Sequence, residues 1–109
     1  MITWDDFAKL DIRSGTILTA QPFEKAKKPA YQLEIDFGTL GIKKSSAQIT
    51  HHYSSEELIG KQIVAVINFP PKQIANFFSE CLVLGVYDKD QQVVLLQPSL
   101  TVDNGSKIG

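Results

Sequence analysis

Residues 31–37 read YQLEIDF, and apolar and polar side chains alternate along the whole stretch. The apolar positions are Tyr31, Leu33, Ile35 and Phe37. Because successive side chains on a strand point to opposite faces, a period of two predicts a half-buried antiparallel strand. This is the clearest secondary-structure signal in the chain, and it places one face of a β-sheet in a hydrophobic core.

Short apolar or β-branched runs on both sides of this segment predict more strands. They lie at residues 11–20, 42–49, 63–67, 82–87 and 93–96. The run at 63–67 is continuous, as expected for a strand that is buried on both faces. Gly15 stands where we expect a bulge or a sharp bend in the first of these strands. The last two strands are predicted to form a hairpin around residues 88–92.

Capping residues predict two short helices. Thr3 is followed by Asp5 and Asp6, a pattern typical of an N-cap and a first helical turn. Ser54 or Ser55 is the expected N-cap of a second helix, between the third and fourth strands. The apolar side chains of the first helix are Trp4, Phe7, Ala8 and Leu10. A helix this short needs a packing partner, either the chain's own barrel or a second copy of the chain.

The order of these elements predicts an all-β fold. Several short strands with turns between them point to a small closed barrel rather than to a parallel sheet. Five main strands with a short helix between the third and the fourth is the order of a five-stranded OB-fold barrel. The chain has 109 residues, of which 43% are hydrophobic, so it is long enough for one core. We therefore expect residues 1–109 to form a single domain.

Composition and motifs exclude several classes of function. The net charge is -1, so no overall positive field attracts nucleic acid, and any RNA site must be local. Cys81 is the only cysteine, and His51 and His52 point to opposite faces of an extended backbone. We therefore expect neither a disulfide nor a metal site. No Gly-rich phosphate loop or nucleophile signature is present, so we expect no enzyme activity and no cofactor.

The N-terminal sequence MITWDDFAKLD is too acidic for a signal or transit peptide. No apolar run approaches the roughly 20 residues that a membrane span needs. We therefore expect a cytoplasmic protein that does not insert into a membrane.

Residues 68–80, NFPPKQIANFFSE, form a polar and aromatic insert between two predicted strands. Loops on a rigid framework commonly carry binding residues. Phe77 and Phe78 are adjacent, so on an extended chain one of them points away from the core. That ring is available to a base or to an apolar peptide side chain. Asn68 either bonds a base edge or caps the turn, and Lys72 either meets a phosphate or is solvated.

Six of the eleven basic residues gather in three segments of the predicted barrel. They are Lys25, Lys27, Lys28, Lys43, Lys44 and Lys72. In an OB-fold these positions belong to the first loop, the third strand and the loop between the fourth and fifth strands, which together bind oligonucleotides. Lysines are also common in solvated loops. Their distribution therefore favours a phosphate-binding surface and a merely solvated surface equally.

Five segments, in order along the chain, resemble the CsaA family of export-related chaperones, a branch of the tRNA-binding-domain superfamily. They are LDIRSGTI, LEIDFG, KKSSAQIT, NFPPKQIANFFSECLVLG and VVLLQP. The resemblance implies an OB-fold whose terminal extensions build a homodimer, with Trp4, Phe7 and Ile108 as expected interface residues. It also implies binding of unfolded or pre-secretory polypeptides in protein export, for which Phe77 and Phe78 are the expected contacts.

The same resemblance implies a capacity to bind tRNA. In the superfamily, tRNA contacts come from a serine of the third strand and from an asparagine and a serine that bracket the next long loop. The predicted tRNA-binding residues are Ser46, Asn68, Ser79, Lys43, Lys44 and Lys72. Ala47 stands where other members have a glycine, and Pro70 where a lysine or arginine is common, which lowers the charge of the loop. The chaperone function is therefore placed first, and a dedicated tRNA-binding domain acting in trans is the alternative.

Overall fold

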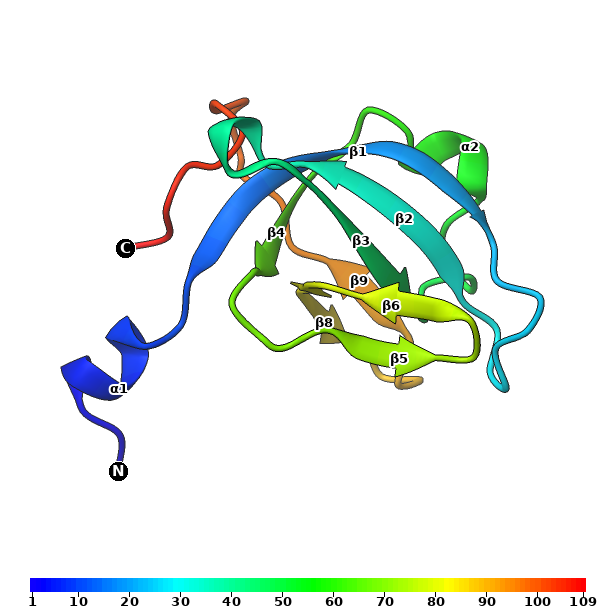
Figure 1. Ribbon diagram of the computed structural model, residues 1–109, viewed down its shortest axis with the longest axis horizontal. Helices are drawn as coiled ribbons and strands as arrows, with labels where there is room; N and C mark the ends of the chain where they lie inside the picture. The colour runs from blue at the N-terminus through cyan, green and yellow to red at the C-terminus, as the bar shows by residue number, and fades with distance from the viewer.

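Each segment predicted as a strand is a strand in the computed structural model, which describes residues 1–109 (Figure 1). In chain order the elements are α1 (Trp4–Ala8), β1 (Ile12–Pro22), β2 (Tyr31–Asp36), η1 (Gly38–Leu40), β3 (Ile42–Ala47), α2 (Ser55–Leu58), β4 (Gln62–Val66), β5 (Lys72–Ile74), β6 (Phe77–Ser79), β7 (Leu82–Val83), β8 (Gly85–Tyr87) and β9 (Val93–Leu95). The strand predicted at residues 82–87 is divided into β7 and β8, and the insert at 68–80 contains β5 and β6.

Five strands form one antiparallel sheet in the order β3-β2-β1-β4-β7. The long central strand β1 pairs with β4 at its start and with β2 towards its end, which lets the sheet curl round on itself. The Glu80 N–H donates to the Lys44 carbonyl oxygen at 2.7 Å and joins the two ends of the sheet. We call this junction, formed by residues 44–46 and 79–81, the seam. The nearly closed five-stranded barrel confirms the predicted all-β, OB-type fold.

The alternating stretch fills the interior of the barrel. Leu33, Ile35 and Phe37 are buried, whereas Glu34 between them is exposed, so the predicted period of two is confirmed. Leu58 of α2 is fully buried in the same core cluster. Burying one large apolar side chain of this kind stabilises a fold by about 1.5–3 kcal/mol. The core is therefore the main source of the barrel's stability.

β4 is buried on both of its faces, as its continuous apolar run predicts. Ile63 and Ala65 belong to the core of the barrel. Val64 and Val66 point the other way and pack with Ile12 in a smaller cluster. This strand therefore joins two separate packing layers.

Gly15 does not form the predicted bulge. The register of β1 against β2 shifts between Ile17 and Thr19 instead. A Cβ atom on Gly15 would lie 2.7 Å from Ile35 Cγ2 and 2.7 Å from the ring of Phe37. The residue is a glycine because the backbone of β1 passes directly against two core side chains.

Both predicted helices begin with a capping box. At α1 the Thr3 hydroxyl accepts from the Asp6 N–H at 3.2 Å, and the Asp6 carboxylate accepts from the Thr3 N–H at 3.0 Å. At α2 the N-cap is Ser54 rather than Ser55, and Glu57 is its partner. Neither helix is long and apolar enough to cross a membrane.

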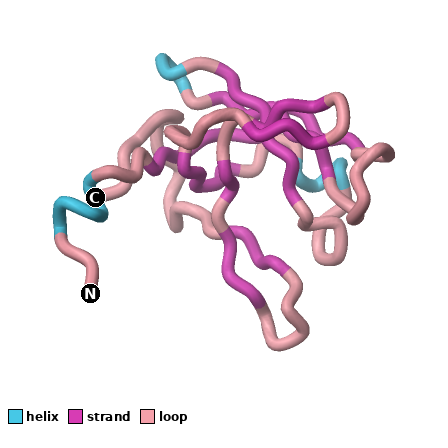
Figure 2. The backbone as a smooth tube through the Cα atoms, turned by 60° about the horizontal axis from the view of Figure 1, so that its bottom comes forward, coloured by secondary structure: helices cyan, strands magenta, loops and turns pink.

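The two ends of the chain lie on the same side of the barrel (Figures 1 and 2). The C-terminal segment turns at Asn104 and Gly105 and then runs beside the start of β1. There the Ile108 N–H donates to the Ile12 carbonyl oxygen at 2.9 Å. The tail is therefore held against β1 by backbone hydrogen bonds, close to where α1 joins the same strand.

Two hairpins are added to the barrel. β5 pairs with β6, and β8 pairs with β9, as separate two-stranded sheets. In Figure 2 the β8–β9 hairpin extends away from the body of the barrel. Leu84, between β7 and β8, connects it to the sheet, because its N–H donates to the Val64 carbonyl oxygen at 2.9 Å.

Candidate binding groove

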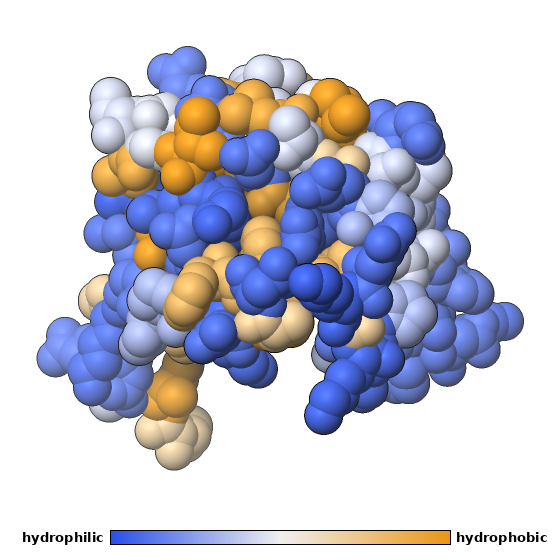
Figure 3. Space-filling view, turned by 45° about the vertical axis from the view of Figure 1, so that its right-hand side comes forward, coloured by the Kyte–Doolittle hydropathy of each residue, from blue (hydrophilic) through white to orange (hydrophobic).

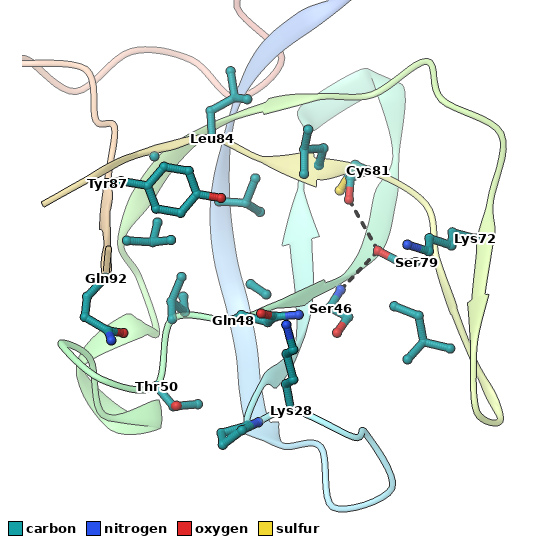
Figure 4. Close-up of a pocket in the computed structure, with 18 of the residues that line it drawn as sticks. Lys28, Ser46, Gln48, Thr50, Lys72, Ser79, Cys81, Leu84, Tyr87 and Gln92 are labelled. Carbon is teal, nitrogen blue, oxygen red and sulfur yellow. Dashed lines mark hydrogen bonds between the residues drawn. The ribbon is translucent and has the colours of Figure 1, made fainter. Parts of the chain in front are cut away.

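A groove of about 1220 Å³ opens beside the seam (Figure 4). Its floor is the end of β3 and the segment after it, which carry Ser46, Gln48 and Thr50. One wall is the β5–β6 hairpin with Lys72, and the opposite wall is the β8–β9 hairpin with Tyr87. Three segments that are far apart in the sequence meet here, so the groove exists only in the folded barrel.

Side chains replace part of the strand pairing along the seam. The Lys44 N–H donates to Glu80 Oε1 at 2.9 Å, while the Lys44 carbonyl oxygen accepts from the Glu80 N–H. Two residues further along β3, the Ser46 N–H donates to Ser79 Oγ at 3.1 Å. Alternate residues of a strand present their backbone groups to the same edge, so Lys44 and Ser46 are successive positions of that edge. The barrel is therefore closed partly by a carboxylate and a hydroxyl.

The structure brings together the two serines that were predicted to contact tRNA, but their hydroxyl groups differ. The Ser79 hydroxyl accepts from the Ser46 N–H and donates to the Cys81 carbonyl oxygen at 3.4 Å. The Ser46 hydroxyl makes no hydrogen bond within the chain, and Ser46 lines the groove. Ser46 is thus the serine whose hydroxyl is open to a ligand, whereas that of Ser79 already serves the seam.

Asn68, the third predicted tRNA contact, lies outside the groove. Its side-chain Nδ2 donates to the Lys9 carbonyl oxygen at 2.7 Å, and its Oδ1 accepts from the Asp11 N–H at 2.9 Å. Both ends of the amide therefore hold the segment between α1 and β1. The proposed role of Asn68 in RNA binding stays a prediction.

Two of the six predicted lysines reach the groove, namely Lys28 and Lys72. The others lie outside it, and they are Lys25, Lys27, Lys43 and Lys44. Lys44 Nζ instead lies 5.4 Å from the centroid of the Phe77 ring, a cation–π contact. Neither an aspartate nor a glutamate lines the groove. The groove is therefore locally positive, although the whole chain has a net charge of -1.

Phe77 and Phe78 point to opposite sides of β6, as predicted. Phe77 is 8% exposed and packs edge-to-face against Phe23, with ring centroids 5.3 Å apart. Phe78 is 48% exposed, and neither ring lines the groove. Phe77 is thus a core residue, and Phe78 offers an apolar surface on the outer side of the hairpin.

Two aromatic residues of the groove were not predicted from the sequence. Phe69 and Tyr87 both line it, and their exposed fractions are 49% and 71%. In the sequence they are difficult to distinguish from core residues, because each follows an apolar run. Their only signal was their position, since both lie beside a loop at the end of a strand.

The side chains around the groove offer binding contacts, and the thiol among them is not activated. Cys81 is buried, and its burial raises the pKa of the thiol to about 11, so the thiol stays protonated at neutral pH. His52 Nε2 lies 2.6 Å from Asp88 Oδ2 in a pair at the end of the β8–β9 hairpin. No three potential ligands gather into a metal site. Hydrogen-bonding groups, positive charge and aromatic side chains are the contacts that the lining offers.

The fold and the groove define a class of protein. A nearly closed five-stranded barrel with a ligand groove between its added hairpins is a binding domain of the OB type. The family described as "Putative tRNA binding domain" matches residues 12–107. The chain therefore belongs to this family of tRNA-binding domains.

Within the family the chain is similar over its whole length to the chaperone CsaA. The crystal structure of CsaA from Bacillus anthracis is 56% identical, with a TM-score of 0.95, and the match covers 100% of this chain and 99% of that one. CsaA from Picrophilus torridus is 55% identical, with a TM-score of 0.94, and both chains are covered completely. These similarities confirm the resemblance to CsaA that the sequence motifs indicate.

The curated relatives include much longer proteins. The methionine–tRNA ligase of Porphyromonas gingivalis is 37% identical over 107 residues, which cover 98% of this chain but 15% of the ligase. The chain thus spans about a sixth of the length of such relatives. The similarity to the ligases is confined to one small part of each ligase, whereas the two CsaA structures match over their full length. This agrees with the prediction that the chain is not an enzyme.

Proposed function

We propose that the chain is a CsaA-type chaperone that binds unfolded or pre-secretory polypeptides in the groove, before their export from the cytoplasm. The observation that carries this proposal is the groove itself, which has exposed aromatic side chains on its walls and a polar floor. The full-length similarity to two CsaA chaperones supports it. The whole chain, residues 1–109, is proposed to act as one OB-fold domain.

The dimensions and chemistry of the groove suit a polypeptide segment. Pockets for small molecules typically measure about 300–1,000 Å³, and this groove is larger and open. Phe69 and Tyr87 offer apolar contact area, while Gln48 and Gln92 offer amide groups for a passing backbone. Such a mixture binds many sequences weakly, which is what a chaperone for unfolded chains requires.

Binding of tRNA is the second proposed function. Lys28 and Lys72 line the groove without a carboxylate beside them, so phosphate groups are attracted to it. The open hydroxyl of Ser46 can bond a base edge or a ribose. With Pro70 in place of a cation the loop has little charge, so we place tRNA second. A dedicated tRNA-binding domain without chaperone function is the alternative.

A homodimer is proposed for the same chain. Trp4 is 89% exposed, and Phe7 and Ile108 also expose apolar surface. All three belong to the terminal segments, which lie on one side of the barrel. Figure 3 shows one face of the protein, on which apolar side chains lie beside hydrophilic ones. A helix of five residues is marginal alone, and a second copy that covers Trp4 stabilises it.

An affinity titration at two salt concentrations tests the two ligands. One arm uses tRNA and the other uses a chemically denatured polypeptide, each with the wild-type chain and with Tyr87→Ala. We expect Tyr87→Ala to weaken polypeptide binding several-fold, and we expect the affinity for tRNA to fall much more steeply with salt than that for polypeptide. The control is Leu18→Ala, an exposed apolar residue outside the groove. Polypeptide binding that is equally strong in Tyr87→Ala and wild type contradicts the groove assignment.

Light scattering tests the dimer. We expect the wild-type chain to have twice the mass of one chain, and a chain without residues 1–10 to be monomeric or unstable. A truncated chain that remains a stable dimer would exclude α1 as an essential interface element.

A further inference from the structure

The edge of β3 that forms the seam continues into the groove with open backbone groups. At Lys44 both the N–H and the carbonyl oxygen bond Glu80 across the seam. At Ser46 the N–H bonds Ser79, so the carbonyl oxygen of the same residue also faces this edge, away from β2 and towards the groove. Gln48 is the next residue on this edge, and neither its N–H nor its carbonyl oxygen makes a hydrogen bond. Pairing along this edge therefore ends where the groove begins.

We propose that this open edge binds an extended polypeptide segment as an additional β-strand. The segment pairs with the carbonyl oxygen of Ser46 and with the N–H and carbonyl oxygen of Gln48, and so continues the interactions that Glu80 and Ser79 make with β3. This inference rests on the proposed polypeptide binding and names how the groove recognises its ligand. Pairing through main-chain groups gives affinity without reading the sequence of the ligand.

The chemistry of the open groups favours a polypeptide over RNA. Two of the three are carbonyl oxygens, which need donors. Every second residue of an extended peptide presents one N–H and one carbonyl oxygen to the same edge, so it supplies donors and acceptors together. Phosphate groups only accept hydrogen bonds and are repelled by carbonyl oxygens. The phosphates of an RNA strand therefore leave the two carbonyl oxygens unpaired, and only its 2′-hydroxyl and base N–H groups are donors for them.

The side chains of the groove select among peptide segments. Alternate residues of an added strand point to opposite sides, towards the two walls. Phe69 and Tyr87 provide apolar contact, while Lys28 and Lys72 provide positive charge that no carboxylate of the groove offsets. The groove is therefore complementary to an apolar segment that carries acidic residues. Segments rich in lysine or arginine are disfavoured.

A heptapeptide of alternating leucine and glutamate, labelled with a fluorophore, tests the strand pairing. Two derivatives of this peptide are methylated on every second backbone nitrogen. In one the methylated nitrogens belong to the odd-numbered residues, and in the other to the even-numbered residues. Because only one register faces β3, we expect methylation in that register to weaken binding roughly tenfold and methylation in the other to have little effect. In an NMR experiment the unmethylated peptide should slow hydrogen exchange of the Gln48 amide. Equal effects of the two registers, or an unchanged Gln48 amide, overturn the proposal.

Reversing charges on the peptide and on the protein tests whether the groove selects acidic segments. A second heptapeptide replaces each glutamate by lysine, and the protein variant is Lys28→Glu with Lys72→Glu. We expect the wild type to prefer the glutamate peptide about tenfold and the variant to prefer the lysine peptide. Two exposed lysines outside the groove, in Lys25→Glu with Lys27→Glu, serve as the control that changes net charge equally.

The failure of this inference is distinguishable from a failure of the chaperone function. If denatured polypeptide binds in a Tyr87-dependent manner but shows no register effect, the strand pairing is wrong and the proposed function stands. If no polypeptide binds and a single-stranded oligonucleotide protects the Gln48 amide instead, both are wrong.

Discussion

The barrel is held together in two different ways on its two sides. From β3 through β2 and β1 to β4, neighbouring strands pair over five or six residues each, and the ladders are almost uninterrupted. Across the seam, the Ser79 hydroxyl and the Glu80 carboxylate supply hydrogen bonds that a regular ladder takes from the backbone. A ladder depends on the pattern of many residues, whereas the seam depends on a few individual side chains. The ladder side is therefore the rigid framework, and the seam side is where a groove opens.

The largest effect is expected on the ladder side, from Gly15→Val. A Cβ atom at this position lies 2.7 Å from Ile35 Cγ2 and from the Phe37 ring, so the core must move to admit the side chain. We expect the free energy of unfolding to fall by about 3 kcal/mol, measured by urea denaturation. The control is Thr19→Val, on the exposed part of the same strand, which should change it by less than about 0.5 kcal/mol. An unchanged midpoint for Gly15→Val would contradict the close packing of β1.

At the seam, two neighbouring serines should behave differently. Ser45 is 1% exposed, and its hydroxyl donates to the Cys81 carbonyl oxygen at 2.9 Å, so Ser45→Ala removes a buried hydrogen bond. We expect a loss of about 1–2 kcal/mol in unfolding free energy. Ser46→Ala removes a hydroxyl without an internal partner and should change stability by less than about 0.5 kcal/mol. Urea denaturation of both variants measures the difference, and equal losses would show that the seam does not depend on individual side chains.

The difference between the strand ladders and the seam explains which features could be predicted from the sequence. The alternation in residues 31–37 predicts a ladder, because a period of two is written in the residues themselves. Ser79 and Asn68 were predicted to contact RNA, but each hydrogen-bonds a segment 33 or more residues away. Hydrogen-bond partners so far apart in the chain cannot be predicted from a local sequence pattern. Tyr87 was not predicted as a groove residue, because an aromatic side chain after an apolar run is typical of a core position.

A smaller effect is expected where the N-terminal segment meets the barrel. The Asn68 amide bonds the backbone of Lys9 and Asp11 and thereby fixes the position of α1. Asn68→Ala should lower the free energy of unfolding by about 1 kcal/mol and should speed proteolytic cleavage within residues 1–10. Asn76→Ala, at the tip of the β5–β6 hairpin, is the control. If the Asn68→Ala variant is cleaved at the wild-type rate, the Asn68 amide does not hold residues 1–10 in place.

The smallest effect concerns the turn of the β8–β9 hairpin, where the Asp88 carboxylate is the acceptor of several hydrogen bonds. The Asp88 carboxylate accepts from the Gln92 and Asp90 N–H groups and pairs with His52, and these contacts lower the pKa of Asp88, the Gln92 bond most strongly. A lowered pKa means that the contribution to stability is complete above the unfolded pKa of about 3.9 and is lost as the pH falls through the folded value.

We therefore expect the amide resonance of Gln92 to shift as Asp88 becomes protonated, at a pH below the unfolded value of about 3.9. In Asp88→Asn this titration should disappear, because the asparagine oxygen still accepts the hydrogen bonds but carries no charge to lose. His52→Gln separates the two kinds of partner, since it removes the imidazole and leaves both backbone donors in place. A titration midpoint of Asp88 that rises only slightly in His52→Gln would agree with the backbone as the main cause. A midpoint that returns to the unfolded value would instead make the pair with His52 the interaction that holds this wall of the groove.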